Sequence, residues 1–238
     1  MKKIMIKWFP PSWVQIKFGK MVSYLDPAFL RTNFVDYPKT IEFTRWPDPI
    51  DGLPENLEIA DYIFITHHHK DHCKDVTIKR LANENTTIFA PKNCVKKIPF
   101  PVTVVKSGDT FELKELKAEV VQAYNLPKYE GQKIFHPKGK GVGYVIIINH
   151  KSIYHTGDSG LIPEMKQIKN IELAFLPIGN RDFTMDIDEA VLASVIIKPK
   201  FIIPIHRYAE NPHEFKQRVE KKKTSTVLPV ETGKAIMI

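Results

Sequence analysis

The sequence predicts an α+β fold in which two β-sheets pack face to face with helices outside. Short runs rich in Val, Ile, Phe and Tyr, punctuated by Gly, Pro and Asp, dominate the first half of the chain. Helical patterns occur at three places. No long Pro/Gly/Ser linker, repeat or low-complexity stretch divides the 238 residues. A chain of this length fits one domain with a sizeable core, so residues 1–238 are predicted to form a single domain.

Each expected strand is an apolar, β-branched or aromatic run bounded by turn residues. In the first half these runs are 12–17, 21–25, 40–44, 61–66, 87–90, 101–105, 110–113 and 117–123. In the second half they are 142–149, 151–155, 172–177 and 201–205. Asn149-His150 would form the tight turn between the first two of these. Helices are expected near 74–83, 186–197 and 212–223.

The most informative stretch is Thr-His-His-His-Lys-Asp-His-Cys at 66–73, directly after the apolar run 62–65. It contains four candidate metal ligands in the spacing His-x-His-x-Asp-His, namely His67, His69, Asp71 and His72. Extended backbone sends alternate side chains to one face, so the first three would converge on one point and the last would project toward a second. Imidazole nitrogen and carboxylate oxygen suit zinc, iron and related metals. The stretch therefore predicts half of a two-metal site rather than a solvated loop.

This motif resembles the signature of the metallo-β-lactamase superfamily. The turn Gly157-Asp158 offers the aspartate that, by this resemblance, bridges two metals, and His206 after an apolar run offers the terminal histidine. The closest resemblance is to the branch of Zn-dependent hydrolases of the β-lactamase fold. That branch carries Ala-Tyr-Asn, His-Pro-Lys-Gly and Gly-Tyr-Val-Ile, present here at 123–125, 136–139 and 143–146. The resemblance spans about residues 13–208 and implies a four-layer αββα sandwich.

One ligand position departs from the superfamily pattern. The third histidine of the first metal site would follow residues 120–123, where this chain has Tyr124-Asn125. An amide oxygen is a weak zinc ligand compared with imidazole, so His136 is the favoured replacement. Two alternatives stay open: Asn125 completes the site, or His136 merely caps its loop.

The resemblance implies a pair of divalent ions, with zinc favoured and manganese or iron as alternatives. One ion would be held by His67, His69 and His136, and the other by Asp71, His72 and His206. Asp158 would lie between them. Asp26 matches an aspartate that supports the metal histidines from behind, and a simple Asp-Pro turn is the alternative interpretation.

Such a pair of ions, about 3.5–4 Å apart, holds a hydroxide at neutral pH and polarises the bond it attacks. Asp71 would also accept a proton during the attack. The hypothesis is therefore a metal-dependent hydrolase that cleaves an ester, lactone, amide or phosphodiester bond. A small anionic substrate is expected because the loop 126–140 carries four lysines, Lys128, Lys133, Lys138 and Lys140. Substrate-binding residues cannot be identified from the pattern, although Ser159 and Arg181 are candidates.

Two other functions are weighed against this hypothesis. A nuclease or a nucleic-acid-binding protein would suit the net charge of +8, although the basic residues are scattered and Lys221-Lys222-Lys223 suits the end of a surface helix. A di-iron redox protein is less favoured, because superfamily members of that kind carry Glu where this chain has His69 and usually append a flavin-binding domain.

The expected location is the cytoplasm. No apolar run is long enough to span a bilayer, and lysines and prolines interrupt any signal-peptide core near the start. Two cysteines are too few for a disulfide framework, and Cys73 is expected to be a small buried side chain. The oligomeric state cannot be predicted.

Overall fold

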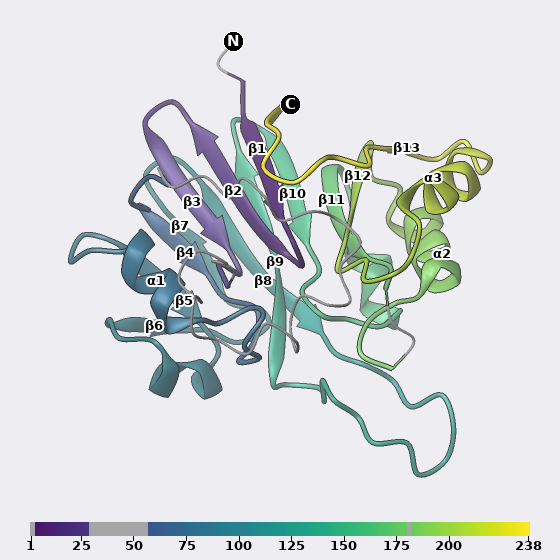
Figure 1. The fold of residues 1–238 in the computed structure, drawn as a ribbon, viewed down its shortest axis with the longest axis horizontal. Helices are drawn as coiled ribbons and strands as arrows, with labels where there is room; N and C mark the ends of the chain where they lie inside the picture. Colours follow the sequence, from purple (N-terminus) through teal and green to yellow (C-terminus); the bar gives the residue numbers. More distant parts are fainter. Residues whose placement is uncertain (1–2, 29–56, 180–181) are drawn as a thin grey trace. The chain divides into compact units, whose positions relative to one another are not determined.

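The computed structural model describes residues 3–28, 57–179 and 182–238, and it divides into two compact units. Unit 1 comprises Met1–Val105 and Val230–Ile238, and unit 2 comprises Lys106–Pro229. Within the described residues, each unit is built on one seven-stranded mixed sheet (Figure 1). The expectation of a single domain over 1–238 stays a prediction.

The sheet of unit 1 has the strand order β14-β1-β2-β3-β4-β5-β6. Its strands are β1 (Met5–Phe9), β2 (Trp13–Phe18), β3 (Met21–Leu25), β4 (Tyr62–Phe64), β5 (Thr87–Ala90), β6 (Val102–Val104) and β14 (Ile236–Met237). Strands β14 to β3 pair antiparallel, and strands β3 to β6 pair parallel. Parallel strands end at the same edge of a sheet, so the segments that follow β3, β4 and β5 emerge there together.

Helix α1 (Asp75–Leu81) and the 3-10 helix η2 (Lys92–Lys97) supply apolar side chains to the core of unit 1. Ile78 and Leu81 of α1 join a buried cluster with Ile63 of β4 and Ile88 of β5, which are paired across the sheet. Cys94 of η2 belongs to the same cluster. Because alternate strand residues share a face, this cluster marks the helix-covered side of the sheet.

The sheet of unit 2 has the order β13-β12-β11-β10-β9-β8-β7. Its strands are β7 (Thr110–Glu112), β8 (Lys117–Ala123), β9 (Gly141–Ile148), β10 (Lys151–His155), β11 (Ile171–Pro177), β12 (Phe201–Ile205) and β13 (Thr226–Val227). Strands β7 to β10 are antiparallel and β10 to β13 parallel, which repeats the pattern of unit 1. Asn149 and His150 have φ of 48° and 64°, as a tight hairpin turn requires, so the predicted turn is confirmed.

Helices α2 (Ile187–Ile197) and α3 (Pro212–Glu220) lie side by side next to β12 and β13, and the 3-10 helix η3 (Pro163–Gln167) precedes β11 (Figure 1). Helix α2 begins with a capping box. The Asp186 carboxylate accepts the N–H of Glu189 at 2.9 Å, and the Glu189 carboxylate accepts the N–H of Asp186 at 3.3 Å. Ala190 of α2 and Phe215 of α3 are fully buried in the core of the unit.

All three predicted helices are confirmed, and β3, β5, β8, β10 and β12 have the predicted bounds. The predicted strand 40–44 lies outside the described residues. Among the described residues, three strands were not predicted, β1, β13 and β14. Strand β1 was missed because its lysines suggested a basic terminus, although Ile4, Ile6 and Trp8 are buried at alternate positions. None of the helices in the described part of the chain is long and apolar enough to cross a membrane.

Candidate metal centre

The histidine-rich motif of unit 1 is a turn rather than an extension of β4. The strand ends at Phe64, two residues short of its predicted end. The backbone N–H groups of His72 and Cys73 both donate to the carbonyl of His69, at 3.1 and 2.8 Å. This turn brings the centroid of the His72 ring to 4.1 Å from the centroid of the His67 ring. The prediction that alternation along extended backbone places these side chains was therefore wrong, because the turn reverses the chain within the motif.

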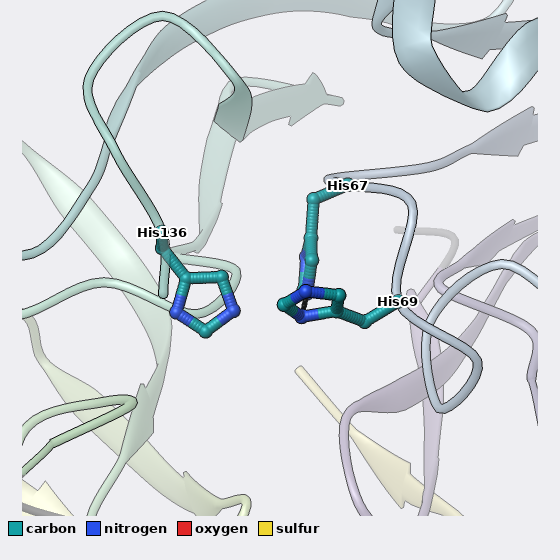
Figure 2. A group of neighbouring side chains, drawn as sticks. All are labelled: His67, His69 and His136. Carbon is teal, nitrogen blue, oxygen red and sulfur yellow. Dashed lines mark hydrogen bonds between the residues drawn. The ribbon is translucent and has the colours of Figure 1, made fainter. Parts of the chain in front are cut away.

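The motif nevertheless gathers its donor atoms closely. His67 Nε2 lies 3.1 Å from His69 Nδ1, on the loop that follows β4 (Figure 2). Two nitrogens bound at about 2.0–2.1 Å to one tetrahedral zinc ion would be about 3.3 Å apart, close to this separation. Asp71 Oδ2 lies 3.9 Å from His72 Nε2. Unit 1 thus presents three imidazoles and one carboxylate within one short loop.

Asp26 follows β3 with a φ of 46°, and its side chain is fully buried. Its carboxylate accepts hydrogen bonds from the Thr66 amide at 2.7 Å, the Thr66 hydroxyl at 2.6 Å and His72 Nδ1 at 2.7 Å. A hydrogen bond on Nδ1 leaves Nε2 as the nitrogen of that ring that is available to a metal ion. Asp26 therefore lies where a residue that supports the metal histidines would lie.

Thr66 has a positioning contact that the sequence pattern did not reveal. Its hydroxyl donates to Asp26 and lies 3.0 Å from His67 Nδ1, so it accepts the proton of that nitrogen. This again leaves Nε2 as the nitrogen available to a metal ion. The only sequence signal was the position of Thr66 directly before the first histidine of the motif.

The other two residues of the motif that could carry chemistry, His68 and Cys73, contact other parts of unit 1. His68 Nδ1 lies 3.2 Å from the Asn93 amide nitrogen of η2, and Lys97 donates to the His68 carbonyl. Burial, and then the positive charge of Lys97, lower the pKa of His68. Cys73 is 3% exposed in the core beside Cys94, which confirms the prediction that it is buried.

Unit 2 carries a second buried group of donors. Asp158 lies in the turn after β10, where the Gly157 N–H donates to His155 Nδ1 at 3.1 Å. His206 directly follows β12, and its Nε2 lies 3.3 Å from Asp158 Oδ2. His136 Nε2 lies 3.6 Å from the same oxygen. Two imidazoles therefore converge on one carboxylate, and all three residues are buried.

Gly179 determines how closely the chain can approach His206. It follows β11, and a Cβ placed on it would lie 2.0 Å from the His206 carbonyl oxygen and 2.7 Å from the Arg207 carbonyl carbon. A glycine is therefore required for the ends of β11 and β12 to lie this close. His206 has a φ of 47°, so its backbone is also held in the left-handed region. The sequence pattern carries no signal for this role of Gly179.

His136 projects from the segment between β8 and β9 (Figure 2). Its Nδ1 lies 2.8 Å from Asn125 Oδ1 and 2.8 Å from the Phe183 carbonyl oxygen. The backbone N–H of Asn125 also donates to the carbonyl of His136, at 2.8 Å. The two residues that the sequence offered as alternatives are therefore hydrogen-bonded to each other.

The structure describes one of the two candidate substrate contacts, Ser159. Ser159 is fully buried, and its hydroxyl contacts the carbonyls of Tyr124 at 3.2 Å and Gly160 at 2.9 Å. It therefore positions the backbone rather than facing a substrate. Arg181 lies outside the described residues.

Several lysines of the loop 126–140 are engaged within unit 2. Lys128 lies 2.8 Å from the Glu189 carboxylate, and Lys138 lies 2.7 Å from that of Glu164. The hydrogen bond between Lys138 and Glu164 raises the pKa of the lysine and lowers that of the glutamate. Lys133 lies over the ring of Phe135 at 5.3 Å. These contacts compete with the predicted steering of an anion.

The donor atoms of each unit are imidazole nitrogens and carboxylate oxygens, a set that suits zinc, manganese and iron.

The family model for the beta-lactamase superfamily domain matches residues 6–206. The chain belongs to the metallo-β-lactamase superfamily. Its superfamily relatives include a UPF0173 metal-dependent hydrolase of Methanosarcina barkeri, which is 33% identical over 193 residues, or 77% of this chain and 83% of the relative.

Two solved structures are similar to this one over nearly the whole chain. A candidate metal-dependent hydrolase of Parabacteroides distasonis is 29% identical with a TM-score of 0.79, over 95% of this chain and 92% of that one. The metallo hydrolase Igni18 of Ignicoccus hospitalis is 25% identical with a TM-score of 0.74, over 99% and 98%. The predicted α+β fold class of metallo-β-lactamase type and the assignment as a metal-dependent hydrolase are thereby confirmed.

Proposed function

We propose that this metal-dependent hydrolase uses two divalent ions to cleave an ester, lactone or phosphodiester bond of a small anionic substrate. Zinc is the favoured metal. The observation that carries the proposal is that each unit holds its own group of nitrogen and oxygen atoms, and that within each group these atoms are spaced like ligands of one ion. The family match across residues 6–206 includes every one of these donors.

The proposed ligand assignment follows the predicted one. His67, His69 and His136 would hold one ion, and Asp71, His72 and His206 the other, with Asp158 shared. In support, His67 and His72 have their Nδ1 atoms hydrogen-bonded within unit 1, so both offer Nε2 outward from their supporting residues. When bound, such ions supply hydroxide at neutral pH and polarise the bond under attack.

The chain itself supplies orientation and a proton acceptor. Asp71 is the more exposed of the two carboxylates among the proposed metal ligands. Because 29% of its side chain is accessible, it can reach a substrate. A carboxylate in that position accepts the proton released as the attacking water adds to the substrate. Asp26 and Thr66 hold the histidine rings and need not touch the substrate.

Removal of metal tests the proposal directly. We expect inductively coupled plasma mass spectrometry to find two metal ions per chain. We also expect the protein to hydrolyse at least one of p-nitrophenyl acetate, a homoserine lactone and bis(p-nitrophenyl) phosphate. Dialysis against a chelator should lower that activity at least tenfold, and zinc, manganese or iron should restore it. Circular dichroism would check that the metal-free chain stays folded. Full activity in a folded, metal-free chain would contradict the proposal.

For the anionic group of the substrate, we propose a pocket in unit 1 rather than the loop 126–140. The pocket has a volume of about 420 Å³ and lies beside the metal motif. Its lining includes four lysines and one acid, namely Lys70, Lys74, Lys96, Lys97 and Asp75. The excess of positive charge favours a phosphate or carboxylate, because opposite charges about 4 Å apart in water attract by about 1 kcal/mol.

Replacing Lys96 by Ala should therefore weaken competitive inhibition by inorganic phosphate by about fivefold, which corresponds to about 1 kcal/mol. Lys96 is exposed, so the free energy of unfolding should hardly change. Lys133→Ala is the matched control from the loop 126–140 and should leave the inhibition constant unchanged. If Lys133→Ala weakens phosphate binding and Lys96→Ala does not, the pocket is excluded and the loop becomes the anion site.

A further inference from the structure

The hydrogen bonds of His136 define which of its nitrogens carries the proton. A backbone carbonyl can only accept, so the contact of 2.8 Å with the Phe183 oxygen requires that Nδ1 donates. The contact of 2.8 Å with Asn125 then orients the amide with its oxygen toward the ring. In the neutral ring the lone pair lies on Nε2, the atom 3.6 Å from Asp158 Oδ2.

Asn125 and His136 are also joined by a hydrogen bond between their backbones. Its N–H donates to the His136 carbonyl at 2.8 Å, although the two residues are eleven positions apart. The pair therefore closes the base of the loop that Figure 1 shows between β8 and β9. Both residues are buried, with 9% of Asn125 and 6% of His136 exposed. A buried amide whose oxygen is used in this way is not available as a ligand.

On these grounds we infer that Asn125 is a positioning residue for His136, the ligand proposed above for the position of the third histidine in the superfamily pattern. The inference rests on the proposed function for the metal itself. Asn125 compensates for the displaced histidine by holding it in the Nδ1–H form with Nε2 available to an ion. A neutral amide and a carbonyl support His136, whereas a buried carboxylate supports His72 at 2.7 Å.

This difference predicts unequal binding of the two ions. A carboxylate partner raises the basicity of a histidine ligand more than an amide does. The ion held by His136 should therefore be released first as a chelator is added. Asn125→Asp places a carboxylate behind His136 in the same geometry, so it should reduce the difference in affinity between the two ions.

The first test needs no metal. In the metal-free wild-type protein, long-range ¹H–¹⁵N correlation spectra should show His136 with its proton on Nδ1. A spectrum with the proton on Nε2 would overturn the inference. This measurement decides the point even if the chain proves to bind no metal, so its failure is distinguishable from failure of the proposed function.

The second test separates ligand from support in the cobalt(II)-substituted protein. Asn125→Ala should lower metal affinity about 10–100-fold, yet leave the cobalt absorption spectrum of the saturated protein unchanged. His136→Gln should change that spectrum and lose one ion per chain. Gln132→Ala is the loop control, because it removes a contact with Asp182 at 3.0 Å without touching His136, and it should alter neither quantity. An altered spectrum in Asn125→Ala with a normal one in His136→Gln would make Asn125 the ligand.

Discussion

Replacing Asp71 by Asn is expected to lower kcat/KM by about 10²–10⁴-fold with almost no change in the free energy of unfolding. Asparagine has the shape of aspartate but cannot accept the proton of the attacking water, and its amide is a poor metal ligand. The side chain of Asp71 is 29% exposed, so the replacement should change the free energy of unfolding by less than about 0.5 kcal/mol. Steady-state kinetics and chemical denaturation of the same preparations would measure the two quantities.

The metal content of Asp71→Asn distinguishes the two roles proposed for Asp71, proton acceptor and metal ligand. A slow variant that still holds two ions would have lost the proton acceptor, and a slow variant with one ion would have lost a ligand. Glu84→Gln removes an exposed carboxylate elsewhere in unit 1 and should behave like the wild type. Equal activity of Asp71→Asn and wild type would end this mechanism.

The sequence predicted which side chains gather in the candidate metal centre better than it predicted the backbone geometry that gathers them. The spacing of His67, Asp71 and His72 identified the motif, because metal ligands must be of a few residue types at short intervals. Alternation along a strand was the wrong reason for their convergence. The N–H groups of His72 and Cys73 turn back to the His69 carbonyl, and a sequence pattern carries no signal for those bonds.

Long-range contacts were the part that the sequence could not provide. The bond between Asp26 and His72 joins residues 46 positions apart, and only the resemblance to a family suggested it. Thr66 and Gly179 act through one hydroxyl and one missing Cβ, which look ordinary in a sequence. Asn125 and His136 were offered as competitors because their hydrogen bond could not be foreseen.

The lysines illustrate the same limit for charge. Lys128 and Lys138 were expected to steer an anion because they lie in one loop. Their ion pairs with Glu189 and Glu164 depend on α2 and η3, which lie 26 or more positions further along the chain. Conversely, Lys70 and Lys96 are distant in sequence and line one pocket. Charge patterns along a chain therefore predict net attraction but not the place where it acts.

Replacing Asp26 by Asn should lower zinc affinity about 10–100-fold and the free energy of unfolding by about 1–3 kcal/mol. The aspartate accepts three hydrogen bonds, from the Thr66 N–H, the Thr66 hydroxyl and His72 Nδ1. The Thr66 N–H cannot turn away, so the asparagine oxygen must face it and the NH₂ group must face the other two partners. The hydroxyl can rotate to accept, but His72 must then lose its proton from Nδ1 and carry it on Nε2, the proposed ligand atom.

Two measurements check this prediction: denaturation of the metal-free variant and calorimetric titration with zinc. Backbone strain does not confuse the result, because asparagine tolerates the φ of 46° found at Asp26. Asp61→Asn is the matched control, since the Asp61 carboxylate also accepts a distant backbone N–H, that of Val22 at 2.8 Å, but contacts no histidine in the described structure. It should leave zinc affinity unchanged. A zinc affinity of Asp26→Asn within twofold of the wild type would mean that His72 does not bind metal through Nε2.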